Sequence, residues 1–185
     1  MNPLKATLFL LVLSLTACGV PKSYFTVGVR TKLENASITM EQLQFYVDRD
    51  VELRRELASG EAKVTSGKVK FENGKYIHII YLKRFTPGVC TAVSADRLDV
   101  SFEMGDGKNL VFGVPAGAGA EVGYQIFAQE WVRTQGSRRE VGKIMYDGNP
   151  YFIQPSGIAA RLLIQKSVVD KFEVERRVMK GRKIE

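Results

Sequence analysis

The residue best suited to acid–base chemistry is His78, the only histidine among 185 residues. It lies in the run Tyr76-Ile77-His78-Ile79-Ile80, which predicts a position in the middle of a strand. A histidine base could activate Cys90 or a serine as a nucleophile. Because the chain has no Gly-x-Ser-x-Gly turn to present such a serine, we expect no catalytic residue. We expect His78 to lie at the edge of the core and to bond one partner.

Paired carboxylates could hydrolyse glycosides. The nearest pairs are Asp48 with Asp50 and Asp96 with Asp99. Each pair lies in or beside a predicted turn, where aspartate bends and caps the chain. We therefore expect these four residues to shape turns.

A glycine-rich stretch could cradle a phosphate. Gly117, Gly119 and Gly123 fit neither the dinucleotide fingerprint nor the Walker loop, and no basic residue follows in the required place. The stretch predicts a loop between strands, and no cofactor is expected.

Two basic clusters could meet an anionic partner. The first surrounds Gly136-Ser137 and comprises Arg133, Arg138, Arg139 and Lys143, after Trp131. Interfaces favour tryptophan and arginine, so these five side chains are the candidate contacts for a partner or a membrane. The second cluster comprises Lys171, Arg176, Arg177, Lys180, Arg182 and Lys183.

The N-terminal segment has a basic start, an apolar run and a small-residue exit. Lys5 precedes the apolar run 6–17, which ends in Leu15-Thr16-Ala17, and Cys18 follows. This order is typical of a secretory signal. A run of about 12 residues is too short to span a membrane as a helix, which needs about 20.

Leu15-Thr16-Ala17-Cys18 resembles the lipobox of bacterial lipoproteins. The resemblance implies cleavage between Ala17 and Cys18, a diacylglyceryl group on the Cys18 sulfur and a further acyl chain on the new amino group. Two or three such chains anchor a protein stably where one does not. Gly19 follows the cysteine in place of aspartate, which by resemblance to enterobacterial sorting implies the outer membrane of a bacterial envelope.

Lipidation of Cys18 would also limit metal and disulfide chemistry. Cys90 would then have no cysteine in the chain to pair with, so no disulfide framework is expected. One histidine and one remaining cysteine are too few for the usual zinc sets, so no metal site is expected. The setting Val89-Cys90-Thr91-Ala92-Val93 predicts a buried strand.

Length and charge bound the remaining choices. Removal of residues 1–17 leaves 168 residues, which suits one domain with a real core. The net charge of +7 falls to about +6 without Lys5, which favours anionic lipids, anionic glycans or acidic proteins as partners. Nucleic acid is not expected for an exported, anchored chain. We expect a lipidated tether over 18–22, a β domain over 23–180 and a basic tail over 181–185.

Alternation of apolar and polar residues dominates the domain and predicts strands. The alternation is clearest over 25–29, 98–104 and 172–174. Further strand candidates are 76–82, 89–93, 124–132, 151–153 and 158–166. Many short strands with Gly- and Pro-rich turns predict a mainly β fold, a single antiparallel β-sandwich or a small barrel.

Turn chemistry fixes one hairpin register. Asn73-Gly74 suits a two-residue turn in which both central residues need φ > 0. This turn would pair Phe71 with Tyr76 and Val69 with His78.

A second hairpin is expected around Gly105-Asp106-Gly107. A three-residue loop would pair Phe102 with Leu110 and Val100 with Phe112, with the last glycine left-handed. A two-residue loop would mix apolar and polar residues on one face, so we favour the longer loop.

Residues 38–58 fit two patterns. Leu43, Val47 and Val51 recur every four residues, as in a helix, but a larger apolar set shares one parity, as in strands. We favour strands with Asp48-Arg49-Asp50 as a bend, and room for one short helix within 38–58.

The sequence thus predicts a membrane-anchored envelope lipoprotein that acts as a non-catalytic interaction, binding or structural module. One alternative is a carrier of a small lipid or glycan, which would need a closed barrel with an apolar cavity. Another is an envelope hydrolase, which would need two carboxylates converging in a cleft.

Overall fold

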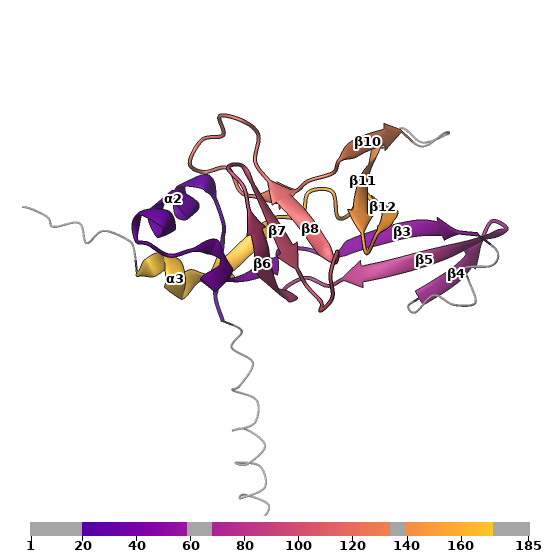
Figure 1. Ribbon diagram of the computed structural model, residues 1–185, viewed down its shortest axis with the longest axis horizontal. Coiled ribbons are helices and arrows are strands. Elements are labelled where there is room, and N and C mark those ends of the chain that lie inside the picture. The colour runs from indigo at the N-terminus through magenta and orange to yellow at the C-terminus, as the bar shows by residue number, and fades with distance from the viewer. Residues whose placement is uncertain (1–19, 59–67, 134–139, 172–185) are drawn as a thin grey trace, which may run out of the picture.

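The computed structural model describes residues 20–58, 68–133 and 140–171, which form two antiparallel sheets and two α-helices (Figure 1). In spatial order, the first sheet comprises β1 (Lys22–Tyr24), β13 (Leu162–Gln165), β2 (Gln44–Val47), β6 (Pro87–Val93), β7 (Arg97–Ser101), β8 (Asn109–Gly113) and β9 (Gln125–Ile126). The second comprises β10 (Glu130–Arg133), β11 (Glu140–Tyr146), β12 (Asn149–Ile153), β3 (Val51–Leu57), β5 (Lys75–Leu82) and β4 (Lys68–Glu72). Within these ranges neither sheet closes on itself, so the mainly β prediction is confirmed in its sandwich form, not as a barrel.

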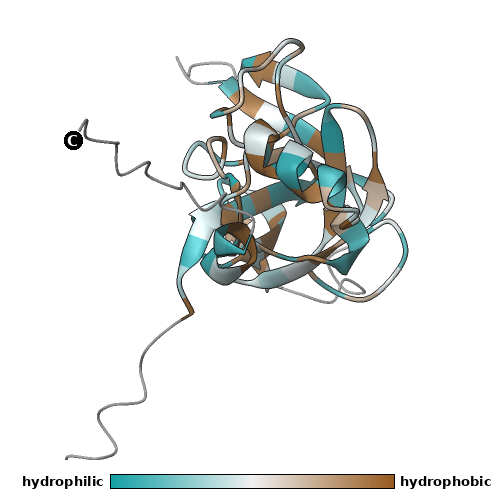
Figure 2. Ribbon diagram, turned by 90° about the vertical axis from the view of Figure 1, so that its left-hand side faces the viewer, coloured by the Kyte–Doolittle hydropathy of each residue, from teal (hydrophilic) through white to brown (hydrophobic). Residues whose placement is uncertain are grey.

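The core lies between the two sheets. Alternate residues of the strands are buried, and Figure 2 shows hydrophobic and hydrophilic residues alternating along them. At its centre, the Phe25 ring lies 5.1 Å from that of Phe45 and 5.0 Å from that of Tyr124, between ring centroids. Removal of such apolar surface from water is the main force that stabilises the fold.

The strand interpretation of residues 38–58 is confirmed. A short 3₁₀-helix, η1 (Met40–Gln42), precedes β2, and a bend at 48–50 leads into β3. The single short helix allowed in this region is therefore η1.

The predicted first strand over 25–29 is wrong, because β1 ends at Tyr24 and residues 27–29 are helical. A helix, α2 (Val27–Asn35), begins there, and Thr26 caps it by accepting a hydrogen bond from the Val29 N–H at 3.3 Å. Two further N–H groups of the first turn bond the loop at 120–122, from Val27 to the Val122 carbonyl and from Gly28 to the Ala120 carbonyl. The Thr26 cap and these hydrogen bonds to the loop satisfy the free N–H groups at the start of α2. A helix therefore forms in a segment whose alternation of apolar and polar residues is typical of a strand.

The β4–β5 hairpin has the predicted register. Phe71 pairs with Tyr76 and Val69 with His78. Asn73 and Gly74 have φ of 49° and 79°, as the two-residue turn requires.

The predicted register of the second hairpin is wrong by two residues. Val100 pairs with Leu110 and Leu98 with Phe112, and the loop runs from 102 to 108. A two-residue slip leaves every side chain on its own face, so the apolar pattern cannot detect it. Gly107 is left-handed as expected, at φ 72°, and its carbonyl accepts a bond from the Asp147 N–H, a distant contact that helps to hold the longer loop.

Two predicted strands are shorter than expected. The segment 124–132 divides into β9 and β10, because it crosses from one sheet to the other between them. The segment 158–166 forms a strand only at β13, followed by a short helix, α3 (Lys166–Asp170).

Of the two predicted domain boundaries, only the N-terminal one lies within the described residues. Lys22, expected in the tether, is already part of β1. The predicted strand at 172–174, the basic tail at 181–185 and the lipobox at 15–18 lie outside the described residues.

Candidate functional site

His78 and Cys90 lie in different sheets, in β5 and β6. His78 is buried, and its Nδ1 lies 2.7 Å from the hydroxyl oxygen of Tyr151, so its predicted place at the core with a bonded partner is confirmed. Cys90 is also buried, as predicted, and its thiol donates to the Ala92 carbonyl at 3.3 Å. Burial raises the pKa of the Cys90 thiol to about 11. The thiol therefore stays protonated at neutral pH, whereas the nucleophile would be the thiolate.

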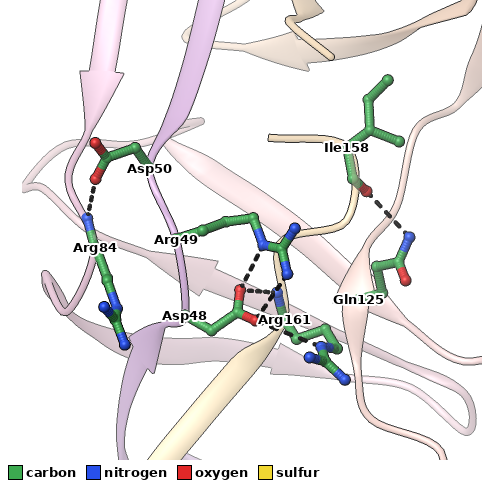
Figure 3. A network of polar contacts seen from close by, with 7 residues as sticks. All are labelled: Asp48, Arg49, Asp50, Arg84, Gln125, Ile158 and Arg161. Carbon is green, nitrogen blue, oxygen red and sulfur yellow. Dashed lines mark hydrogen bonds and ion pairs between the residues drawn. The ribbon is translucent and has the colours of Figure 1, made fainter. Parts of the chain in front are cut away.

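Asp48 fixes the bend between β2 and β3 (Figure 3). Its carboxylate accepts the backbone N–H of Arg161 at 2.8 Å and the Arg49 Nε–H at 3.2 Å, and lies 3.4 Å from Arg161 Nε. The predicted turn role of Asp48 is thus confirmed.

Asp50 fixes the neighbouring turn at 83–86. It accepts the Arg84 backbone N–H at 2.7 Å (Figure 3) and the Tyr81 hydroxyl. These two hydrogen bonds, the one from Tyr81 first, lower the pKa of Asp50. Of the other predicted pair, Asp99 lies within β7 and not at a turn.

Sequence analysis missed a polar hollow of about 280 Å³ beside His78. Glu103 accepts the Tyr146 hydroxyl at 2.5 Å and lies 3.4 Å from Lys108 Nζ, and the Tyr151 ring lies 6.2 Å from that of Tyr146. Burial, and then the bond to Glu103, raises the pKa of Tyr146. No sequence signal could have located this hollow, because its residues come from separate segments joined only by the fold.

Three of the five predicted contact residues fall on the β10–β11 hairpin, and Arg138 and Arg139 lie outside the described residues. Trp131 pairs with Gly142 and has 47% of its surface exposed. Arg133 lies 3.5 Å from Glu140, and Lys143 lies 3.3 Å from Glu130. Both described cations of this cluster thus have a carboxylate partner across the hairpin, which lowers the net positive charge there.

A groove of about 540 Å³ follows the outer face of the second sheet, next to this hairpin. Its apolar floor is formed by Ile77, Val132, Val141 and Phe152, all half-buried. Its charged rim is formed by Arg54, Glu56, Glu72, Lys75 and Arg133. Sequence analysis found only Arg133 of this set, because the outward positions of β3, β5 and β12 look like ordinary solvated faces.

The rim of the groove is balanced in charge. Arg54 lies 3.2 Å from Glu72, and Lys75 lies 2.8 Å from Glu56. These exposed pairs contribute little to stability. They leave a surface with an apolar floor and charges of both signs.

Across the described ranges, no three His, Cys, Asp or Glu side chains gather closely enough to hold a metal ion. Within the same ranges, no helix has the length and apolar character needed to cross a membrane. Comparison with protein-family models, with curated proteins and with solved structures found no match.

Proposed function

We propose that this protein is a lipid-anchored component of the bacterial envelope that binds a segment of another envelope polypeptide in the groove on its second sheet. The observation that carries the binding role is the groove itself, with its apolar floor and its rim of balanced charge. The anchoring role rests on the lipobox-like sequence ending at Cys18.

The arrangement of the molecule supports this combination. In Figure 1, helices α2 and α3 and the start of the described chain lie at one end, and the β3–β5–β4 arm lies at the other. The groove is lined by residues of that arm and of β10–β12, so it includes residues at the end of the molecule away from the start of the described chain.

The chemistry of the groove favours a polypeptide over an anionic glycan. A phosphorylated or acidic sugar would be held by cations without bonded carboxylates, whereas Arg54 and Lys75 each have a carboxylate partner. Half-buried Val141 and Phe152 would instead contact apolar side chains. Among the described strands β10 is the end of its sheet, so its outer edge can pair with an extended segment of the partner.

The carrier alternative has weaker support. The hollow beside His78 holds about 280 Å³ and its apolar neighbour about 260 Å³, both below the roughly 300–1,000 Å³ of typical ligand pockets. The described sheets also do not form the closed barrel that a carrier of this kind would need.

The anchor is tested by comparing the wild type with Cys18→Ser in a Gram-negative host. We expect the wild type to lose residues 1–17, to gain acyl mass and to sediment with membranes, and the variant to do none of these. Equal masses and equal partition of the two proteins would show that the lipobox likeness is a coincidence.

The groove is tested by placing a photo-crosslinking residue at Val132 and, as control, at Val89 on the first sheet, where 51% of the surface is exposed. A protein crosslinked only from position 132 is then purified and titrated. We expect Val141→Glu to weaken its binding at least tenfold and Val89→Glu to leave it unchanged. Equal binding by both variants, with both still folded, would reject the groove as the binding site.

A further inference from the structure

The first described residues form a basic and aromatic surface together with the turn at 83–86, and this surface shares no residue with the groove. A hollow of about 510 Å³ there is lined by nine residues, five of which are Val20, Lys22, Tyr24, Arg84 and Phe85, and Arg161 packs against the Tyr24 ring. We call these six residues the anchor-side patch: Val20, Lys22, Tyr24, Arg84, Phe85 and Arg161.

Cations lie directly on aromatic rings in the anchor-side patch. Lys22 Nζ lies 4.8 Å from the centroid of the Phe85 ring, and the guanidinium of Arg84 lies 4.2 Å from it. The guanidinium of Arg161 lies 4.0 Å from the Tyr24 ring. Phe85 and Tyr24 each keep 42% of their surface exposed. At a membrane surface, tyrosine rings lie at headgroup level, phenylalanine rings lie at the boundary between headgroups and acyl chains, and Lys and Arg reach the phosphates.

Phe85 is held in a strained conformation that keeps its ring outside the core. It has φ 64° in the turn at 83–86, where the Thr86 N–H bonds the Lys83 carbonyl. Glycine or asparagine is preferred at such a position, and a bulky residue there is strained. The Phe85 N–H bonds the Val47 carbonyl at 2.9 Å, and Asp50 holds the N–H of Arg84. The fold thus presents an exposed ring at a position that glycine would fill without strain.

The charge around the patch is mostly positive. Of its two carboxylates, Asp48 lines the same hollow and bonds Arg161 and Arg49 (Figure 3), and Asp50 accepts hydrogen bonds from the Arg84 N–H and the Tyr81 hydroxyl. Asp48 has only 6% of its side chain exposed. Asp50 lies at the surface, but Lys83 and Arg84 lie close to it, so cations outnumber carboxylates on this surface.

The patch is also tied by chain length to the lipid-bearing residue. Val20 is two residues from Cys18, and a chain spans at most about 3.6 Å per residue. A lipid on Cys18 would thus hold Val20 within about 7 Å of the membrane surface.

We propose that the anchor-side patch docks on the anionic phospholipid headgroups of the membrane that carries the lipid anchor, with Phe85 at the boundary between headgroups and acyl chains and Lys22 and Arg84 on the phosphates. This inference rests on the proposed anchoring at Cys18. Such docking fixes the orientation of the domain on the membrane.

The test uses the mature protein extracted from membranes, with the acyl groups verified by intact mass, and reconstituted into vesicles of brominated phosphatidylcholine with or without 30% phosphatidylglycerol. The native Trp131 reports the hairpin beside the groove. Trp131→Phe with Phe85→Trp places the only tryptophan in the patch, and Trp131→Phe with Phe71→Trp places it on the arm. In vesicles with phosphatidylglycerol, we expect bromine to quench the tryptophan fluorescence of the Phe85→Trp protein at least twofold more than that of the Phe71→Trp protein or of the protein with native Trp131.

Charge variants separate headgroup docking from the effect of the tether. Arg84→Glu in the tryptophan-85 protein should reduce the quenching, because each basic residue near an anionic surface changes partition about fivefold. Lys75→Glu, on the groove rim, is the matched control and should leave it unchanged. Equal quenching with and without phosphatidylglycerol, or equal quenching at 85 and 71, would overturn the proposal while the acyl mass still supports the anchor. A preparation without acyl mass would overturn the anchor, and this inference with it.

Discussion

Asp48 and Arg161 bond each other through their backbones and through the Asp48 carboxylate, although 113 residues separate them. The Asp48 N–H donates to the Arg161 carbonyl at 3.0 Å, and the Asp48 carboxylate accepts the Arg161 N–H at 2.8 Å. This double link joins the bend before β3 to the start of β13. It therefore positions both the first sheet and the anchor-side patch.

Replacement of Asp48 by alanine should destabilise the protein by about 2 kcal/mol, because it leaves a partly buried N–H and two arginines without their acceptor. Urea unfolding followed by circular dichroism measures this loss. The control is Asp96→Ala, which removes an exposed carboxylate 3.7 Å from Arg97 and should cost less than about 0.5 kcal/mol. Equal losses for the two variants would contradict the structural role of Asp48.

Acid should loosen the turn at 83–86 through Asp50. Hydrogen bonds from Tyr81 and the Arg84 N–H lower the pKa of Asp50 below its ordinary value of 3.8. A carboxyl whose folded pKa is lowered contributes stability that is fully present above the unfolded pKa and is lost as the pH falls through the folded pKa. We expect the melting temperature of the wild type to fall more steeply below about pH 4 than that of Asp50→Asn. Parallel profiles between pH 5 and pH 2 would show that Asp50 carries no such linkage.

Cys90 should react slowly with thiol reagents in the folded protein. Its pKa of about 11 leaves about 0.1% thiolate at pH 8, against roughly a quarter for an unperturbed cysteine. We expect iodoacetamide to alkylate the native thiol at least a hundredfold more slowly than the unfolded one. In denaturant, a thiol reagent should detect one free thiol, Cys90, both in the lipidated protein and in Cys18→Ser. A chain with an unmodified Cys18 would give two. Rapid alkylation of the native protein would show that Cys90 is accessible.

Strand pairing is predictable from the sequence where a specific turn type and an alternation of apolar and polar residues lie within a few residues of each other. Asn73-Gly74 set the β4–β5 register because its turn type allows only one pairing. The alternation around Val100 placed each face correctly but not the register, since a slip of two residues preserves the faces. The helix α2 could not be predicted, because loop carbonyls at 120 and 122 satisfy its first N–H groups. Those contacts exist only once the chain has folded.

The candidate sites were less predictable than the fold. Of the groove residues only Arg133 was predicted as a contact, because arginine is typical of interfaces, whereas the groove floor uses Ile77 and Phe152, which lie 75 residues apart. The anchor-side patch was missed because the exposure of Phe85 depends on its positive φ, and because the neighbours of Phe85 come from β1 and β13, far away in the sequence.

Loss of the Tyr151 hydroxyl should destabilise the core around His78. Tyr151→Phe removes the oxygen that lies 2.7 Å from His78 Nδ1, in a setting where both residues are buried. The expected cost is about 1–2 kcal/mol in the free energy of unfolding. Tyr76→Phe is the matched control, because its ring is 40% exposed, and should be nearly neutral. A neutral Tyr151→Phe would mean that this contact adds no net stability.

Gly142 marks the closest approach between β11 and the segment that crosses between the sheets. A Cβ added at Gly142 would lie 2.7 Å from the Cβ of Ala128 and 3.3 Å from both Ile153 and Trp131. Alanine at 142 should therefore cost about 1–3 kcal/mol by overpacking. Gly119→Ala is the control, since a Cβ there meets nothing within 4 Å, and a shift of less than about 0.5 kcal/mol is expected.

The source of the Gly142 clash can be isolated with a second substitution. Ala128→Gly removes the nearest atom, so the double variant Gly142→Ala with Ala128→Gly should be more stable than the sum of the two single losses implies. Additive losses in urea unfolding would place the strain elsewhere, at the Trp131 or Ile153 contact. Ala128 and Ile153 are both buried, but the contact with Ala128, at 2.7 Å, is shorter than the contact with Ile153, at 3.3 Å, so most of the strain lies at Ala128. We therefore expect a favourable coupling of about 1 kcal/mol between positions 142 and 128.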